Sequence, residues 1–180
     1  AYMDTLTDLD IISFFSKILD ILVAKYPNHK ILMLPQIFNS GYESGDKIFF
    51  DRLKLSYNND NLIALDEVYN SDIQQSIIAN ADLMVGARYH SIVFAINNAT
   101  PFVAFNYEHK IEGLLRLLGK TQQLVDLTES LLTKEGTTNA IKEFEEKLEL
   151  ANSDEEAKIK AKAIAMSCFE KFETYLNSDL

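Results

Sequence analysis

The fold is decided by residues 81–119, ADLMVGARYHSIVFAINNATPFVAFNYEHKIEGLLRLLG. This stretch begins with a short apolar strand over residues 83–85, and a turn connects it to an apolar helix that extends to about residue 98. A second buried strand covers residues 102–105, and the amphipathic helix after it ends at Gly119. Two strands joined by a helix of this length form a βαβ unit, from which parallel sheets are built.

The polar side chains of this stretch follow the ends of its two strands. They are Arg88, Tyr89, His90 and Ser91 after the first strand, and Tyr107, Glu108, His109 and Lys110 after the second. Ligands of parallel sheets bind at the carboxyl ends of the strands. We therefore expect the functional site to lie there.

The rest of the chain also alternates between helical spacing and short apolar runs. The predicted helices cover residues 6–26, 46–55, 71–79, 127–134, 138–150 and 154–175. The predicted strands cover residues 30–34, 62–65 and, as a last short strand or an extended connection, 123–125. Ser71 is the expected cap of helix 71–79, Gly136 is expected to end helix 127–134, and residues 152–154 supply the break and cap before the last helix. Cys168 is expected to be a buried, inert thiol.

This order predicts a Rossmann-like, doubly wound α/β domain with a parallel sheet over residues 1–126. A helical carboxyl-terminal extension over residues 127–180 is expected to pack on it. A Rossmann-type half normally opens on its innermost strand, whereas this chain opens on a helix. We therefore expect the first strand to lie upstream, and this chain to be one domain of a larger enzyme.

Composition excludes several classes of function. The chain has 180 residues, a net charge of −10 and one cysteine. No basic stripe is present to contact nucleic-acid phosphates, and nothing approaches the apolar length of a transmembrane helix. The single cysteine excludes an internal disulfide and a cysteine-based zinc site, and no pair of histidines has metal-ligand spacing. We expect no bound metal, no nucleic-acid partner and no transmembrane segment.

Arg88 and His90 have the chemistry best suited to an anionic substrate. Backbone N–H groups at a helix start attract anions, and arginine adds a planar fork that fits a carboxylate or a phosphate. Histidine can donate or accept a proton near neutral pH. Lys110 could reach an anion from the second strand end, where Glu108 could hold a sugar hydroxyl or orient a base. The competing interpretation is that these residues are ordinary caps and solvated side chains.

Three further polar residues are expected to be structural or solvated. Asp66 and Glu67 follow strand 62–65 in a solvated loop, with sugar contact as the alternative, and His29 lies away from the site. The chain has neither a G-x-G-x-x-G nor a Walker loop, and no G-x-S-x-G elbow. These absences argue against a conventional dinucleotide enzyme, a P-loop NTPase and a serine hydrolase.

Three segments in combination resemble the carboxyl-terminal part of the polysaccharide pyruvyl transferase family. They are an R-x-H-S turn into a helix (residues 82–95), a Pro-led strand (residues 101–104), and a tyrosine and a lysine that open the next helix (residues 107–115). This resemblance covers about forty residues. Residues 32–36 resemble an upstream family segment more weakly.

The resemblance implies a fold and a reaction. Family members have a two-domain fold like that of the GT-B glycosyltransferases, with the reaction in the cleft between the domains. They transfer pyruvate from phosphoenolpyruvate, the donor substrate, to two hydroxyls of a sugar, which gives a cyclic ketal in a surface polysaccharide or exopolysaccharide. No further cofactor is implied. The family's arginine and histidine associated with donor binding correspond to Arg88 and His90, with Tyr89 between them.

On that basis we expect this chain to form one half of such an active site. Arg88 would clamp the anion, His90 would act as acid or base or bind the phosphate, and Lys110 would be a second cation for the leaving phosphate. The expected substrate-binding set is completed by Tyr89, Ser91, Tyr107 and Glu108. A missing amino-terminal domain would contact the sugar or glycan acceptor, and the enzyme would be cytoplasmic, at most peripheral to the membrane.

Two other functions stay open from the sequence. The same half-fold binds nucleotide sugars in GT-B glycosyltransferases and in sugar epimerases, so this chain could be a nucleotide-sugar-dependent domain. Binding of a nucleoside diphosphate sugar without any response to phosphoenolpyruvate would favour that class. The other possibility is a non-catalytic domain that binds a partner through its acidic helical tail, and a gene encoding these residues alone would favour it.

Overall fold

The computed structural model describes residues 8–37, 45–107 and 109–178. Its helices are α1 (Asp8–Lys25), α2 (Asp46–Ser56), α3 (Ser71–Ala79), α4 (Tyr89–Asn98), α5 (His109–Leu118), α6 (Lys134–Leu150) and α7 (Glu155–Ser178), with short 3-10 helices η2 (Thr121–Gln123) and η3 (Ser130–Leu132). Its strands are β1 (Ile31–Met33), β2 (Leu62–Ala64), β3 (Met84–Gly86), β4 (Phe102–Asn106) and β5 (Leu124–Asp126). No helix in these ranges is both long and apolar enough to cross a membrane.

The strands are parallel and form two sheets, one with the order β1-β2 and one with the order β3-β4-β5. The predicted α/β fold with parallel strands is thus confirmed, and the layout agrees with a Rossmann-like arrangement. One feature differs from the single sheet expected from the sequence. Among the described residues, no strand pairs with the edge of β1 that faces away from β2, or with the edge of β3 that faces away from β4. The strands therefore form two separate sheets.

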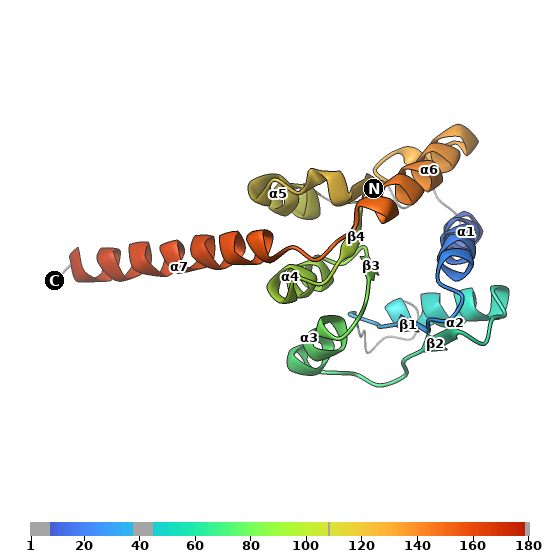
Figure 1. The fold of residues 1–180 in the computed structure, drawn as a ribbon, viewed down its shortest axis with the longest axis horizontal. Coiled ribbons are helices and arrows are strands. Elements are labelled where there is room, and N and C mark those ends of the chain that lie inside the picture. Colours follow the sequence, from blue (N-terminus) through green and yellow to red (C-terminus); the bar gives the residue numbers. More distant parts are fainter. Residues whose placement is uncertain (1–7, 38–44, 108, 179–180) are drawn as a thin grey trace.

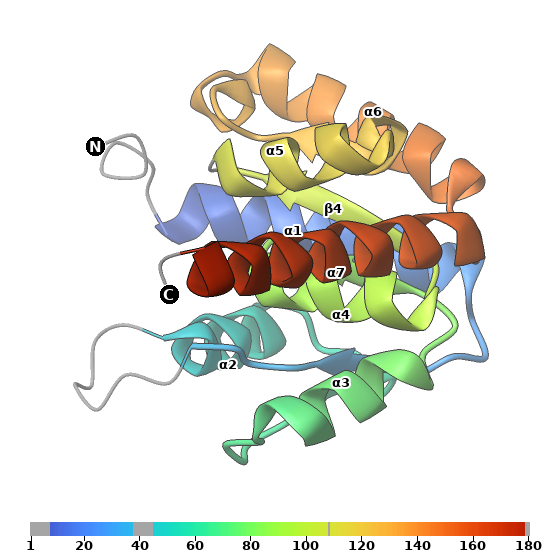
Figure 2. The same ribbon diagram turned by 90° about the vertical axis from the view of Figure 1, so that its left-hand side faces the viewer.

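Helices cover both faces of the sheets (Figures 1 and 2). α1, α2 and α6 lie on one face, where α1 contacts both of the others. α3, α4 and α5 lie on the other face, and α7 packs across α4 and α5 on its outer side. Because β4 is sandwiched between these layers, all five of its residues are buried, which explains its continuous apolar sequence.

A cluster of aromatic rings joins α1, β4 and α6. Phe105 of β4 is fully buried, and its ring centroid lies 5.7 Å from that of Phe14, 5.6 Å from that of Phe15 and 5.5 Å from that of Phe144. Such ring pairs add to the free energy gained by burying the apolar area itself. This cluster fastens α6 to the strand that leads into the candidate site.

The cap of α3 is Asn70, so the prediction of Ser71 was wrong by one residue. The Asn70 side chain accepts a hydrogen bond from the backbone N–H of Ile73 at 2.9 Å, while Ser71 is already the first helical residue. Asparagine and serine are about equally good caps, so composition alone did not separate them.

The prediction that Gly136 ends a helix over residues 127–134 was also wrong. α6 begins at Lys134, and the Thr133 hydroxyl caps it by accepting a hydrogen bond from the Gly136 N–H at 3.0 Å. The η3 turn lies directly against this helix start, so a Cβ at position 136 would collide with the Ser130 carbonyl oxygen. Glycine allows this close approach and does not stop a helix here.

Cys168 is exposed, which contradicts the expectation of a buried thiol. Early in α7, Ala161 and Ile164 pack against the core, but the helix continues well past the other layers (Figure 1). Farther along, Met166, Phe169 and Phe172 are all more than half exposed. The apolar pattern predicted the helix correctly, but this chain does not cover that part of it.

Asp154 fixes the start of α7, and its removal should loosen this helix. Its carboxylate accepts a hydrogen bond from the Ala157 N–H at 2.9 Å and pairs with Lys120, and the Asp154 side chain is 13% exposed. Burial works to raise the pKa of Asp154, but the Lys120 and Ala157 hydrogen bonds outweigh it and lower the pKa. The stabilisation is therefore complete above the unfolded-state pKa of about 3.9 and is lost as pH falls through the lower folded-state pKa.

We expect Asp154→Ala to cost about 1 kcal/mol for the lost cap and to make α7 more accessible to protease at neutral pH. Limited proteolysis of the full-length protein, followed by mass mapping of the cuts, measures this directly. Glu156→Ala, an exposed position in the same turn, is the matched control and should leave the cleavage rate unchanged. Equal cleavage of the two variants would contradict the role of Asp154.

Candidate functional site

Arg88 lies where β3 gives way to α4, at the carboxyl edge of the sheet. β3 ends at Gly86, and Arg88 is the residue that precedes the first turn of α4, with an extended backbone (φ −102°, ψ 134°). Its side chain makes no capping hydrogen bond to the helix. The guanidinium is therefore available for contacts across the strand ends.

The Arg88 guanidinium binds two side chains, one at the start of α2 and one directly after β4. Its Nε donates a hydrogen bond to Asp46 Oδ1 at 3.1 Å, and its Nη2 donates to the same oxygen. Its Nη1 donates to the hydroxyl oxygen of Tyr107 at 2.8 Å. Tyr107 directly follows β4, so the structure brings together the two strand ends that the sequence singled out.

Asp46 is the residue of this site that sequence reasoning missed. It is the first residue of α2, its side chain is 11% exposed, and its Oδ2 accepts hydrogen bonds from the backbone N–H groups of Gln36 at 2.9 Å and Ile37 at 3.0 Å. Asp46 thus connects the loop after β1 to Arg88. An acidic residue in the first turn of a helix that follows a strand was the available signal, but it is a common one.

The charge of Arg88 is maintained by its partners. Burial works to lower the pKa of Arg88, but the hydrogen bonds and charge of Asp46, with a smaller effect from Tyr107, raise it above its ordinary value. The guanidinium is therefore positive at any working pH. Among the described residues, three of its five N–H donors have partners, which leaves two donors for a ligand on a side chain that is 37% exposed.

Ser91 has a structural role in this turn. Its hydroxyl donates a hydrogen bond to the Arg88 carbonyl oxygen at 2.7 Å, and the residue is buried. A Cβ at position 86 would lie 2.7 Å from the Ser91 Oγ and 2.9 Å from the Met84 Sδ. Glycine at position 86 therefore lets the first turn of α4 pack closely onto the end of β3, which sets the position of Arg88.

We expect Gly86→Ala to destabilise the protein by about 1–3 kcal/mol, because the added methyl group must displace Ser91 and the first turn of α4. Gly113→Ala is the matched control. A Cβ at position 113 meets nothing within 4 Å, and alanine is the better helix former, so that variant should be slightly stabilised. Thermal unfolding of both full-length variants measures the difference. A Gly86→Ala variant as stable as the wild type would contradict this account of the turn.

The other predicted site residues lie at the same edge and are more exposed. Tyr89 and His90 form the first turn of α4, where the His90 ring lies 5.9 Å from the Tyr89 ring and 6.5 Å from that of Phe94. Lys110, in the first turn of α5, is also exposed. Glu108 lies outside the described residues. The structure thus places His90 and Lys110 in the first turns of α4 and α5, both with exposed side chains.

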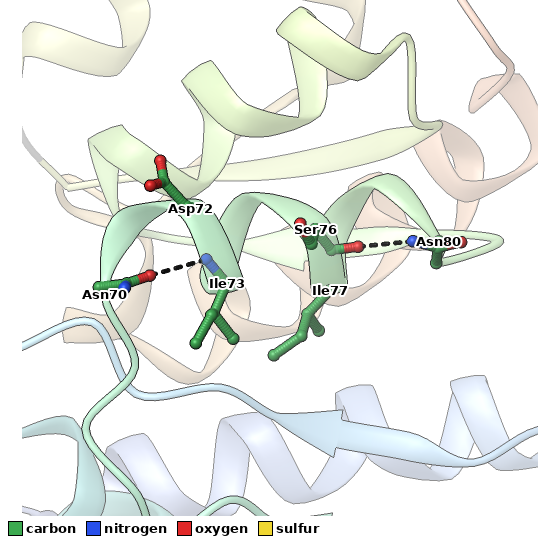
Figure 3. Close-up of a pocket in the computed structure, with 6 residues that line it drawn as sticks. All are labelled: Asn70, Asp72, Ile73, Ser76, Ile77 and Asn80. Carbon is green, nitrogen blue, oxygen red and sulfur yellow. Dashed lines mark hydrogen bonds between the residues drawn. The ribbon is translucent and has the colours of Figure 1, made fainter.

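The remaining polar candidates lie elsewhere. Asp66 is paired with Lys47 at 2.9 Å on an exposed surface, where the hydrogen bond and charge of Lys47 lower the pKa of the carboxyl group. A shallow hollow on α3 is lined by polar residues that include Asn70 and Asn80, whose side chains make hydrogen bonds within this segment, as Figure 3 shows. The described residues contain no group of three or more possible metal ligands.

Comparison with known proteins identifies the family. The sequence profile described as "Polysaccharide pyruvyl transferase" matches residues 4–109, which is more than half of the chain and includes Arg88 and Tyr107. The chain belongs to the polysaccharide pyruvyl transferase family. Family membership thus agrees with the resemblance noted in residues 82–115.

One curated relative of this family member is the amylovoran biosynthesis protein AmsJ of Erwinia amylovora. It is 36% identical over 66 residues, which make up 36% of this chain and 15% of AmsJ. The match therefore spans a small part of that relative. No solved structure matches the chain significantly.

Proposed function

We propose that the full-length protein transfers pyruvate from phosphoenolpyruvate to two hydroxyls of a sugar during the synthesis of a surface polysaccharide or exopolysaccharide. Family membership and the likeness to a polysaccharide biosynthesis protein support the general role. The observation that carries the donor assignment is the Arg88 guanidinium, which is oriented at the carboxyl edge of two parallel strands and has two N–H donors without a partner among the described residues. Arginine suits the planar carboxylate and the phosphate of this donor.

The reaction needs acid and base chemistry beside the bound anion. Overall, phosphoenolpyruvate and a sugar diol give the cyclic ketal and inorganic phosphate. C3 of the enol gains one proton, and C2 forms bonds to two sugar oxygens while its bond to the phosphate oxygen breaks. The two hydroxyls release two protons, of which one balances the proton gained at C3 and the other leaves with phosphate.

We assign these steps to the exposed residues at the two helix starts. His90 is the acid or base, because an imidazole can transfer a proton near neutral pH. Lys110 is the second cation, positioned to stabilise the leaving phosphate from the first turn of α5. Tyr107 and Asp46 hold Arg88 in place, and Tyr89 and Glu108 belong to the proposed substrate contacts.

The proposed enzyme is a two-domain protein of the GT-B type. It works in the cytoplasm, at the membrane where glycan units are assembled. Residues 1–126 form its Rossmann-like carboxyl-terminal domain, and residues 127–180 form a helical extension. An amino-terminal domain supplies the opposite wall of the cleft and the contacts to the glycan acceptor.

A thermal-shift panel on the full-length protein tests the donor class. Phosphoenolpyruvate should raise the melting temperature in a saturable way, since a ligand at a hundred times its Kd stabilises the native state by about 2.7 kcal/mol. A nucleoside diphosphate sugar should not. The reverse pattern would replace the pyruvyl transfer with glycosyl transfer.

We expect His90→Ala to reduce turnover by about a hundredfold or more while the Kd for phosphoenolpyruvate changes little, because a general acid or base acts on the chemical step. Phosphate release from phosphoenolpyruvate, with membranes of a strain lacking the protein as the acceptor source, measures turnover. His29→Ala, an exposed histidine before β1 and away from the Arg88 site, is the control. Unchanged turnover in His90→Ala would remove this residue from the mechanism.

A further inference from the structure

The edges of β1 and β3 face each other across an apolar cavity. Within the described residues, β1 pairs with β2 and β3 pairs with β4, so each has a second edge with no strand beside it. A cavity of about 1010 Å³ is lined by residues 29–34 from the β1 side and residues 81–88 from the β3 side. We call this cavity the β1–β3 groove.

The β1–β3 groove lies in the layer of the sheet, between two layers of helices. Phe15, Ile18 and Leu22 of α1 line it from one face. Ile77 and Ile78 of α3 line it from the other, and Figure 3 shows Ile77 projecting from its helix on the side away from Asp72. Its walls are therefore apolar on both faces, as the surroundings of a buried parallel strand are.

Side-chain contacts bridge both ends of the groove. Before the two strands, His29 Nε2 lies 3.9 Å from the carboxylate of Asp82. After them, Asp46 binds both the backbone N–H of Gln36 and the guanidinium of Arg88. β1 and β3 therefore run in the same direction, with their amino ends at one end of the groove and their carboxyl ends at the other.

Both strands also direct backbone groups into the groove that have no backbone partner among the described residues. The Ile31 N–H donates a hydrogen bond to a carbonyl just before β2 at 2.8 Å, and the Met84 N–H donates to one just before β4 at 2.8 Å. Backbone groups alternate sides along a strand. Leu32 of β1 and Val85 of β3 therefore direct their N–H and C=O groups toward the groove.

We propose that one apolar β-strand, from the segment that directly precedes residue 1 in the full-length protein, inserts into the β1–β3 groove parallel to both neighbours. Its N–H and C=O groups would bond to those of Leu32 and Val85 and join the two sheets into one. A small apolar ligand would fill the volume but would bury these polar groups without hydrogen-bond partners, which costs free energy.

The connectivity of the chain identifies the segment. The inserted strand would lie beside β1, on the side away from β2, and α1 would connect it to β1. Because α1 and α2 lie on the same face of the sheet, this crossover has the same hand as the one from β1 through α2 to β2 (Figure 1). The strand order becomes β2-β1-inserted strand-β3-β4-β5. This is the doubly wound order in which the first strand is central and the direction of winding reverses beside it.

The inserted strand would end beside Arg88, because the carboxyl ends of parallel strands share one edge. The backbone that follows it would then enter the donor site next to Asp46. This consequence rests on the proposed function, whereas the insertion itself does not.

Amide hydrogen exchange in the full-length protein tests the insertion without any substrate. The Leu32 and Val85 amides should exchange as slowly as those of Ile31 and Met84, on the order of a hundredfold or more slower than in a variant lacking the residues before position 1. The Phe105 amide, in β4, is the control and should stay protected in the deletion variant. Fast exchange at Leu32 and Val85 in the full-length protein would overturn the proposal.

Two other outcomes would also overturn it. Protection that depends on protein concentration would mean that a second copy pairs with these edges. Protection that survives the deletion would mean that another segment or a ligand fills the groove. Because phosphoenolpyruvate takes no part in the readout, either outcome leaves the proposed function standing, and a failure of donor binding leaves the insertion standing.

Discussion

Replacing Arg88 with glutamine in the full-length protein is expected to weaken phosphoenolpyruvate binding by about a hundredfold. The variant keeps a polar side chain but loses the positive charge and the planar fork. A hydrogen bond to a charged group contributes about 1.5–3 kcal/mol, and each 1.4 kcal/mol is tenfold in Kd, so the loss of two such bonds gives at least this effect. Isothermal titration calorimetry measures the Kd of both proteins.

A matched control separates this effect from a general loss of positive charge. Arg116 is an exposed arginine on α5 that pairs with Glu112 of the same helix, so Arg116→Gln should bind the donor like the wild type. The thermal unfolding of Arg88→Gln without ligand shows whether the lost Asp46 contact has disturbed the fold. A folded Arg88→Gln protein that binds phosphoenolpyruvate within about threefold of wild type would contradict the assignment.

The largest effect on stability is expected for Phe105→Ala. Phe105 is fully buried in β4, and its ring contacts rings from α1 and α6 on the same face of the sheet. Truncation leaves a cavity that these rings cannot fill, at a cost of about 3–5 kcal/mol. Domains are stabilised by only about 5–15 kcal/mol in total, so the domain should melt about 10 °C lower.

Differential scanning calorimetry of the full-length protein measures this loss. Phe169→Ala removes the same side chain from a position on α7 that is 64% exposed, and it should change the melting temperature by no more than about 2 °C. Equal shifts in the two variants would show that the ring cluster does not hold the domain together.

The sequence was sufficient for the elements and for one side of the site. Apolar spacing predicted β3, α4 and β4 almost to the residue, and the continuous apolar sequence of β4 follows from its burial on both faces. The rule that ligands bind at the carboxyl ends of parallel strands then placed Arg88 and Tyr107 at one edge, where they form a hydrogen bond.

The parts that sequence reasoning missed depend on contacts between distant segments. Asp46 is 42 residues from Arg88, and nothing local to α2 indicates that its carboxylate meets a guanidinium. Gly136 looked like a helix stop because its reason for being glycine, the close approach of Ser130, is a packing contact. Cys168 was taken as buried because helical spacing shows that a face is apolar but does not show what covers it.

The central claim is that the full-length protein adds pyruvate to a polysaccharide through the Arg88 site. The most direct measurement is the pyruvate ketal content of surface polysaccharide from cells lacking the protein and complemented with wild type, Arg88→Gln or Arg116→Gln. Wild type and Arg116→Gln should restore the ketal, and Arg88→Gln should not. Ketal content that is unaffected by the deletion, or fully restored by Arg88→Gln, would contradict the account.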